Sequence, residues 1–328
     1  MRYRPFLELM LFVILVFCSC APADPSNSPS SLPEITPKRN EVDSLMALII
    51  EDTGDTDAYL AMHGFLRTAE SFGVPVRLYR VNPNDSAITQ AQTAYADGCV
   101  VFCITNPGAK NNDAIAYLNE RKVSVVTLFD SADSVNYSVS VDNKDYTEDC
   151  ARSLGDRLRA RSLTGGTILI YSFGNGNGGF SEAVSKYYPE FSVKGLTRKA
   201  ANDTAALTEL TAYIKANPDI VGIYVSEREN VHIMMSAISN AGIKDKVSVI
   251  GTGLSEKNIE LFEKGLYALS IIPNYEAGAN AATLCYKLMR GENDKNAIVL
   301  NRHIVYEATL EKYKTLFDQC IDWFGIGK

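Results

Sequence analysis

Short apolar runs alternate with amphipathic stretches along most of this chain. The run 45–50 has no polar alternation, which is typical of a strand buried on both faces of a parallel sheet. From Leu60 onward, apolar residues recur at helical spacing as far as Phe72, and Gly73 is a candidate C-cap. Between these two segments, 51–59 holds four acidic residues, one glycine and two threonines, which predicts a loop. Ligands of open α/β sheets bind outside the carboxyl ends of the strands, so we expect the functional site to begin in this loop.

The same alternation continues through the rest of the chain. Further strands are predicted at 75–80, 99–104, 123–128, 138–141, 167–172, 191–196, 222–225 and 247–250. Helices are predicted at 85–96, 112–120, 146–161, 180–188, 204–216, 231–241 and 256–264. Repeated strand–helix units with buried strands predict parallel sheets covered by helices on both faces. Because these strands are too many for one sheet, the sequence predicts two Rossmann-like lobes with a cleft between them.

The first twenty residues do not follow this pattern. An apolar core of nine residues, 9–17, is too short to cross a membrane as a helix and is typical of a secretory signal. The ending Phe-Cys-Ser-Cys at 17–20 resembles the lipobox of bacterial lipoproteins, which implies lipidation, for example with palmitate, at Cys20. The alternative is an ordinary signal peptide with an incidental cysteine.

Composition narrows the classes of partner and cofactor. Residues 21–42 are rich in proline and serine and predict a flexible tether. The chain has 32 Lys and Arg against 39 Asp and Glu, without a basic cluster, which argues against nucleic acid and anionic membrane surfaces as partners.

Cys99 and Cys103 share one predicted strand, where they lie too far apart to form a disulfide, so we expect them to be buried apolar residues. With no CxxC pair and only scattered histidines, the sequence predicts no metal and no cofactor.

The order of motifs resembles a known family. The stretches that carry the likeness include ALIIEDTGDTDAYLAMHGF, KVSVVTLFDS, SVSVDNKDYTEDCARSLGDRL and GLYALSIIPNYEAGANAATLCYKLMRGE. They are similar to type I periplasmic binding proteins, the ribose-binding and LacI-core group of extracellular solute receptors. The resemblance covers about 44–305 and implies an α/β fold of two Rossmann-like lobes, each a parallel sheet flanked by helices.

In that family three crossovers hinge the two lobes. Here the resemblance implies crossovers near 141–143, 271–274 and 300–303, followed by a closing helix at 309–323. The implied organisation is a signal peptide at 1–20, a tether at 21–42, an N-terminal lobe at 43–141 plus 273–299, and a C-terminal lobe at 142–272 plus 300–328.

Carried over position by position, the resemblance also implies the ligand contacts. Asn143 preserves the family's Asp-Asn pair at the first crossover. Where sugar binders carry an Asp-Arg pair, this chain has Phe129-Asp130. The expected ligand contacts are Asp55, Asp57, Tyr59, Asn106, Phe129, Asp130, Asn143, Phe180, Glu227, Arg228 and Asn274.

Two properties of this set have alternative explanations. Its four acidic residues against one arginine would suit a cationic ligand, or a polyol held by carboxylate acceptors; alternatively, some of these acids face solvent at loop tips. Phe180 could stack on a ligand, or could belong to the core of its helix.

The resemblance implies a receptor, not an enzyme, that captures a small sugar-like or polyol-like ligand in the cleft and delivers it to an ABC permease. The protein would act as a monomer, held by its lipid at the extracytoplasmic face of the cell membrane. The alternatives are a sensory receptor that signals to a membrane kinase or chemoreceptor, and a scaffold that has lost its ligand and serves a protein partner.

Two motifs suggest other activities. Residues 174–179 match GxGxxG between a strand and a helix, the context of a dinucleotide site, yet 195–198 lack the expected acidic residue, which favours a permissive turn. Asp57 and Asp130 could face each other as the carboxylate pair of an exported hydrolase, but no catalytic motif accompanies them.

Overall fold

The computed structural model describes residues 45–105, 109–132, 134–142, 146–174, 178–292 and 296–325. The predicted signal peptide, lipidation at Cys20 and tether lie outside these residues. So do two expected ligand contacts, Asn106 and Asn143, and residues 175–177 of the GxGxxG loop.

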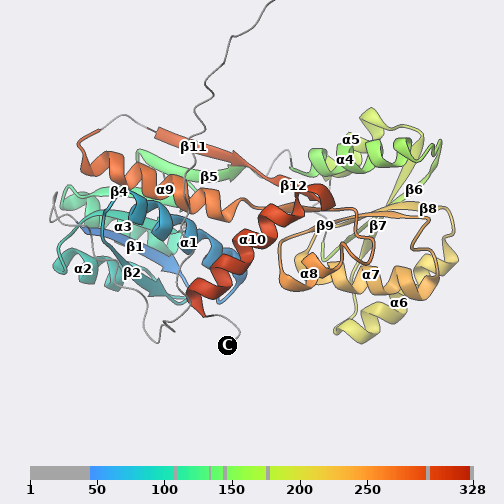
Figure 1. The fold of residues 1–328 in the computed structure, drawn as a ribbon, viewed down its shortest axis with the longest axis horizontal. Coiled ribbons are helices and arrows are strands. Elements are labelled where there is room, and N and C mark those ends of the chain that lie inside the picture. Colours follow the sequence, from blue (N-terminus) through green and yellow to red (C-terminus); the bar gives the residue numbers. More distant parts are fainter. Residues whose placement is uncertain are drawn as a thin grey trace, which may run out of the picture. The chain divides into compact units, whose positions relative to one another are not determined.

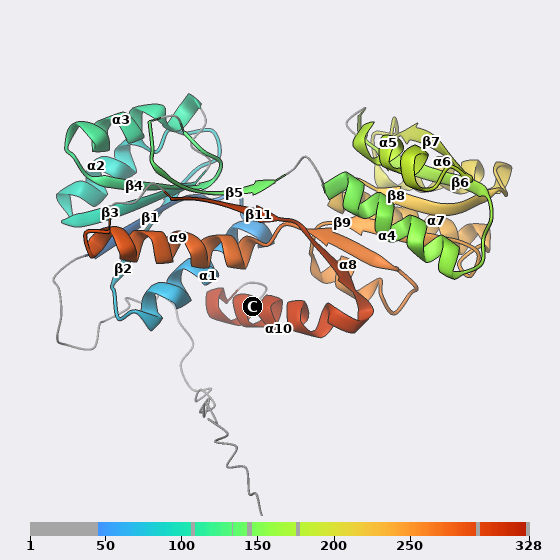
Figure 2. The ribbon, with the colours of Figure 1, turned by 90° about the horizontal axis from the view of Figure 1, so that it is seen from above.

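The first lobe is built on a six-stranded parallel sheet with the order β11-β5-β4-β3-β1-β2 (Figure 1). Its strands are β1 (Leu45–Glu51), β2 (Val76–Val81), β3 (Cys99–Thr105), β4 (Ser124–Phe129), β5 (Tyr137–Asp142) and β11 (Asn296–Asn301). Helices α1 (Thr56–Ser71) and α9 (Asn274–Met289) cover one face, and α2 (Ile88–Ala96) and α3 (Asn112–Glu120) cover the other (Figure 2). A short 3-10 helix, η1 (Ala109–Asn111), precedes α3.

Strand β1 shows why this sheet forms. Its side chains alternate between two cores: Met46, Leu48 and Ile50 pack under α1 and α9, whereas Ala47 and Ile49 pack under α2 and α3. All five are at most 1% exposed. A strand that buries both faces needs apolar residues at every position, which is the pattern that the sequence shows.

The second lobe has the sheet order β12-β10-β9-β8-β6-β7, parallel except for β12, which pairs antiparallel with β10. Its strands are β6 (Gly166–Ser172), β7 (Phe191–Thr197), β8 (Ile220–Val225), β9 (Ser248–Thr252), β10 (Ala268–Ile271) and β12 (His303–Tyr306). Its helices are α4 (Tyr146–Ala160) and α5 (Gly178–Tyr187) on one face, and α6 (Asp203–Ala216), η2 (Arg228–Asn230), α7 (Val231–Ala241) and α8 (Glu256–Glu260) on the other.

The chain passes between the two sheets after β5, after β10 and after β11. Strand β11 belongs to the first sheet and β12 to the second, with only Arg302 between them. The last helix, α10 (Glu307–Phe324), buries Phe317 and Cys320 in the second-lobe core and packs Phe324 against Tyr59 of α1. The fold class is confirmed; the lobe boundaries stay a prediction.

Two predicted boundaries were wrong for local reasons. Helix α1 begins at Thr56 instead of near Leu60, because the Asp55 side chain accepts a hydrogen bond from the backbone N–H of Ala58 and caps the helix. Helix α8 ends at Glu260, four residues earlier than predicted, and turns follow it. The expected acidic loop is therefore short, and half of it is the first turn of α1.

Cys99, Cys103, Cys150, Cys285 and Cys320 are buried free thiols. The prediction of buried apolar roles for Cys99 and Cys103 is confirmed. Over the described ranges, no helix combines the length and apolar character that spanning a membrane would require.

Candidate functional site

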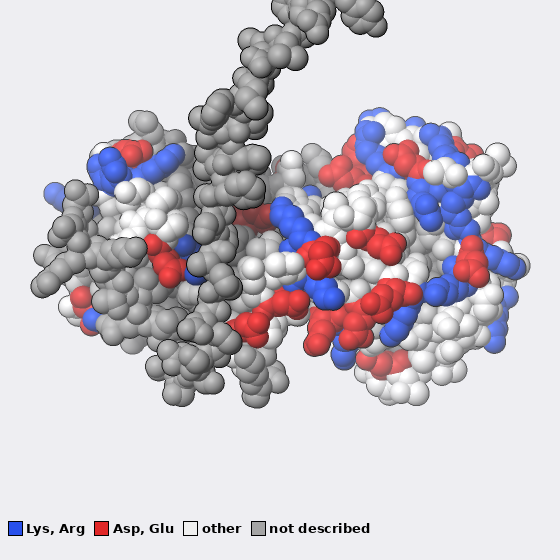
Figure 3. Space-filling view, in the orientation of Figure 1, with Lys and Arg blue, Asp and Glu red and all other residues white. Residues whose placement is uncertain are grey.

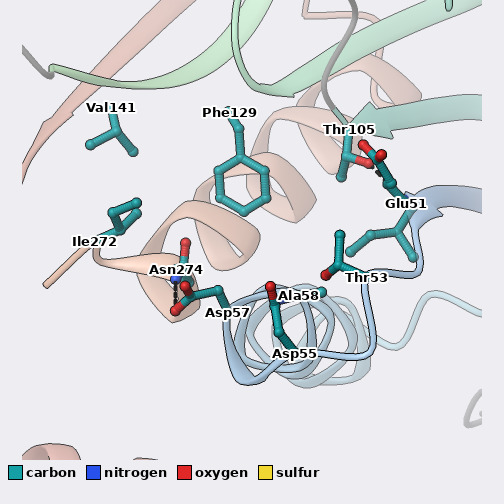
Figure 4. A pocket seen from close by; sticks show the side chains of 11 residues that line it. Glu51, Thr53, Asp55, Asp57, Ala58, Thr105, Phe129, Val141, Ile272 and Asn274 are labelled. Atoms are coloured by element: carbon teal, nitrogen blue, oxygen red, sulfur yellow. Dashed lines mark hydrogen bonds between the residues drawn. The ribbon is translucent and has the colours of Figure 1, made fainter. Parts of the chain in front are cut away.

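A pocket of about 330 Å³ opens in the first lobe, at the carboxyl ends of β1, β3, β4 and β5 (Figure 4). The start of α1 and the connection from β10 to α9 complete its wall. The lining residues are Ile50, Glu51, Thr53, Asp55, Asp57, Ala58, Thr105, Phe129, Val141, Ile272 and Asn274. This is the edge of the sheet at which ligands of parallel α/β folds bind.

Asp57 is the most highly connected side chain of the pocket. It lies in the first turn of α1, where its Oδ1 accepts a hydrogen bond from Asn274 Nδ2 at 2.7 Å (Figure 4). Its Oδ2 accepts a hydrogen bond from the guanidinium of Arg228 at 3.0 Å. Burial raises the pKa of Asp57, and the positive charge of Arg228 opposes this increase. Asn274 is only 3% exposed, so its amide is fixed in place for this contact.

Arg228 brings a second-lobe charge to the first-lobe carboxylates. It lies in η2, directly after β8, and its guanidinium is 3.0 Å from Asp57 and 3.9 Å from Asp55. Asp55 already caps α1, so its carboxylate has both a structural and an electrostatic role. The acidic character predicted for the site is thus partly neutralised by one arginine.

Phe129 contributes the aromatic surface. Its ring points into the space bounded by Asp57 and Asn274 on one side and Thr105 on the other (Figure 4). Its backbone has φ of 75°, a left-handed conformation that a bulky residue seldom adopts. Such outliers cluster at ligand sites, where the surrounding structure must hold them in place.

Glu51 and Thr105 were missing from the sequence-based set. The Glu51 side chain is 13% exposed and forms an ion pair with Lys110 at 2.6 Å. Thr105 Oγ1 accepts a hydrogen bond from the backbone N–H of Glu51 at 2.9 Å, which ties the ends of β1 and β3 together. Each residue directly follows a predicted strand, 45–50 or 99–104, and ends the observed one; that position was the available signal.

Five expected contacts among the described residues are absent from the pocket lining: Tyr59, Asp130, Phe180, Glu227 and Arg228, of which Arg228 reaches the pocket through its ion pairs with Asp55 and Asp57. Tyr59 packs against Phe324, with ring centroids 5.2 Å apart. Asp130 is exposed and accepts a hydrogen bond from the backbone N–H of Ser131. In the second lobe, the Glu227 carboxylate accepts hydrogen bonds from the backbone of Phe173 and the side chains of Ser226 and Asn230. In this structure these two carboxylates are used locally, which fits the alternative that some of the acidic residues do not face a ligand.

Phe180 is a core residue. It is fully buried and stacks on Tyr224, with ring centroids 4.6 Å apart and an interplanar angle of 4°. No face of the ring is open to a ligand in this structure, and we leave Phe180 out of the proposed site.

The structure thus brings Asp55, Asp57, Phe129 and Asn274 together in one pocket, with Arg228 reaching them from η2. Within the described ranges, no three His, Cys, Asp or Glu side chains are grouped so that they could hold a metal ion. The chemistry available is hydrogen bonding by carboxylates, hydroxyls and an amide beside one aromatic ring.

Comparison with known structures gives the same architecture. A carbohydrate transporter solute-binding protein from Agrobacterium radiobacter, in complex with D-arabinose, matches with a TM-score of 0.63 and 19% identity over 85% of this chain and 100% of that chain. A sugar-binding protein of a sugar ABC transporter from Bacillus halodurans matches with a TM-score of 0.69 and 16% identity, over 82% of this chain and 100% of that chain. An arabinose-binding protein from Geobacillus stearothermophilus matches with a TM-score of 0.68 and 18% identity, over 83% of this chain and 99% of that chain.

Sequence comparison assigns the family. No curated protein matches the sequence significantly. The family described as periplasmic binding protein domain matches residues 47–293, about three quarters of the chain. This chain therefore belongs to the periplasmic binding protein family, with the two-lobed fold of its type I members.

Proposed function

We propose that this protein binds a neutral sugar or polyol in the pocket at the carboxyl ends of β1, β3 and β4. The observation that carries the proposal is the convergence of Asp57, Asn274 and Thr105 around the ring of Phe129. Buried sugar hydroxyls need hydrogen-bond partners, and the apolar face of a sugar ring packs well on an aromatic ring. The volume of about 330 Å³ falls within the range of small-molecule sites.

Charge favours a neutral ligand over a cation. Arg228 already pairs with Asp57 at 3.0 Å and with Asp55 at 3.9 Å, and also with Glu229 at 3.5 Å. The remaining pocket carboxylate, Glu51, is paired with Lys110. A ligand cation would therefore have to displace existing ion pairs, whereas a hydroxyl group can donate to the same carboxylates without displacing them. Solved proteins of this fold contain D-arabinose, D-fucose and D-allose, which supports a monosaccharide.

The proposal extends to the role of the whole chain. The protein would be lipid-anchored at Cys20, act as a monomer, release its ligand chemically unchanged, and deliver it to an ABC permease. The family membership and the sugar-transport neighbours support this role, because their partners are ABC transporters.

A thermal-shift panel tests the ligand class. The full chain is melted with D-arabinose, D-ribose, D-allose, D-fucose, glucitol and, as the cationic arm, D-glucosamine. We expect a neutral sugar or polyol to raise the melting temperature by several degrees, because a ligand that binds only the folded state stabilises it. NMR of the recovered ligand should show it unchanged. The proposal would be overturned if D-glucosamine alone stabilised the protein, if no compound of the panel stabilised it, or if the protein chemically changed its ligand.

A further inference from the structure

A second hollow, of about 750 Å³, lies between α8 and α10 on the second lobe and is separate from the ligand pocket. We call it the α8/α10 groove. Its lining residues are Glu256, Ile259, Glu260, Phe262, Glu263, Glu307, Leu310, Glu311, Lys314, Phe317, Asp318 and Ile321. It has more than twice the volume of the ligand pocket, and the sugar-binding proposal does not use it.

The floor of the groove is apolar. Ile259 and Phe262 from the α8 side and Phe317 from α10 are at most 9% exposed and belong to the second-lobe core. Leu310 and Ile321 are partly exposed at its edges. Leu310 and Ile321 therefore supply most of the apolar surface that a partner could cover.

The two walls of the groove are acidic. Residues 256, 260 and 263 lie on one helical face of α8 and the turn after it, and 307, 311 and 318 lie on one face of α10. All six are exposed carboxylates, and Lys314 is the one basic residue that lines the groove. Figure 3 shows acidic side chains gathered over this part of the molecule, with basic side chains and white atoms among them.

The six carboxylates form no direct ion pairs within the described part of the chain, although Lys314 lies between Glu311 and Asp318 on α10. None of the six has a Lys, Arg or His nitrogen within 4.0 Å there. Like charges four residues apart, such as Glu256 with Glu260 and Glu307 with Glu311, are unfavourable on a helix. A positively charged occupant would relieve this repulsion and cover the apolar floor at the same time.

We infer that the α8/α10 groove binds a basic amphipathic helix of a partner protein. The lining stripe of α10 runs from Glu307 to Ile321, roughly 21 Å at 1.5 Å per residue, which matches about four turns of a partner helix. Apolar side chains of that helix lie on Leu310 and Ile321 above the buried floor, and flanking lysines or arginines pair with the two acidic walls. An anionic membrane surface or a nucleic acid would be repelled by the same carboxylates.

The test is a fluorescence anisotropy titration of the full chain with a labelled 18-residue Lys/Leu peptide whose leucines share one helical face. A scrambled peptide of the same composition and a Glu/Leu peptide are the probe controls. The groove variant is Glu260→Gln with Glu311→Gln, one substitution in each wall. The matched control, Glu182→Gln with Glu209→Gln, removes two exposed carboxylates from α5 and α6.

We expect saturable binding of the amphipathic peptide, at least tenfold weaker in the groove variant and for the scrambled peptide, and unchanged in the control variant. Equal weakening in both variants would show that net charge alone drives binding. Equal binding of the scrambled peptide, complete displacement by an equal concentration of spermine, or no saturable binding would also overturn the inference.

Discussion

His63 is a histidine that the fold keeps neutral. It lies on α1 with 3% exposure, against the rings of Tyr275 and Trp323, with centroids 5.5 and 5.4 Å away. Burial, assisted by the charge of Arg67, lowers the pKa of His63 to about 4. Its Nδ1 has no hydrogen-bond partner among the described residues.

This environment predicts acid sensitivity. In the unfolded chain the pKa of histidine returns to about 6.5. Because the unfolded state then binds the proton more tightly than the folded state, lowering the pH below 6.5 favours unfolding. The stabilising effect of neutral His63 is therefore present above pH 6.5 and is lost as pH falls toward 4. We expect a loss of about 2 kcal/mol in the free energy of unfolding between pH 7 and pH 4.5 from this residue.

Urea unfolding of the wild type and a His63→Gln variant at both pH values checks this prediction. The wild type should lose more free energy of unfolding than the variant, by roughly the amount given above, because glutamine does not titrate. Identical pH slopes in the two proteins would show that His63 titrates normally.

Phe129 carries a prediction for binding. Phe129→Leu keeps an apolar side chain of similar size but removes the flat ring, so we expect sugar affinity to fall about three- to tenfold, the loss of roughly 0.5–1.5 kcal/mol of aromatic contact. Calorimetric titration with the best sugar of the thermal-shift panel measures this change. Phe72→Leu, at the other end of α1 where the ring stacks on Tyr286, is the matched control and should bind normally. If the Phe129→Leu variant bound the sugar with unchanged affinity, the Phe129 ring would not contact the ligand.

At the scale of elements, α1 and α9 form an unusually close pair. Each helix carries a glycine that faces the backbone of the other: a Cβ at Gly64 would overlap the carbonyl of Tyr275, and one at Gly278 would overlap the carbonyl of Ala61. This contact places the first turn of α1 beside the start of α9, and so brings Asp57 to Asn274.

Gly278→Ala should therefore destabilise the first lobe. Because the facing atoms are backbone and cannot rotate away, we expect a loss of about 1–3 kcal/mol in the free energy of unfolding, together with weaker sugar binding. Gly195→Ala in β7, where no atom lies within 4 Å of the added Cβ, should leave both unchanged. Denaturant unfolding and calorimetry measure the two effects. If the Gly278→Ala variant were as stable as the wild type, α1 and α9 would have room for the added methyl group and would not be in backbone contact.

Most element positions could be predicted from the sequence because central strands such as β1, β3 and β8 are short apolar runs and the helices have an apolar face. The 112–120 and 231–241 helices were predicted with the bounds that the structure has. Helix α1 was started too late because the cap at Asp55 was interpreted as part of a ligand loop. Sequence shows which residues are acidic, but not whether a carboxylate caps a helix or faces a ligand.

The site was harder to predict than the fold, because the sequence does not show which side chains the packing brings together. Asp57 and Asn274 are 217 positions apart, and only the packing of α1 on α9 joins them. Glu227 and Asp130 follow strands just as Asp57 does, yet local hydrogen bonds hold their carboxylates elsewhere. Thr105 was missed because the resemblance pointed to the next residue, Asn106, whereas Thr105 is the last residue of β3 and lines the pocket.

At the scale of the whole molecule, the ion pair between Asp57 and Arg228 joins side chains of the two lobes. The pair is partly exposed, with 35% and 25% of the side chains accessible, so its strength should be modest. Because the pKa of Asp57 is raised, acid should break this pair at a higher pH than it would break an ordinary aspartate pair.

A double-mutant cycle of Asp57→Asn and Arg228→Gln measures this link. We expect a coupling of about 0.5–1 kcal/mol in unfolding experiments at low salt and neutral pH, and less in high salt. The cycle of Arg228→Gln with Asp113→Asn, two residues without a shared contact, should give no coupling. Zero coupling in the first cycle at low salt would show that the two residues do not pair in solution.

The central claim is that the first-lobe pocket binds a sugar through Asn274 and its neighbours. The most direct measurement is calorimetric titration of the full chain with the sugar that stabilises it most, for the wild type and for Asn274→Ala, with the exposed Asn240→Ala as control. We predict one site per chain, at least tenfold weaker in Asn274→Ala and unchanged in Asn240→Ala. Equal affinity in all three proteins, or no binding by the wild type, would contradict the account.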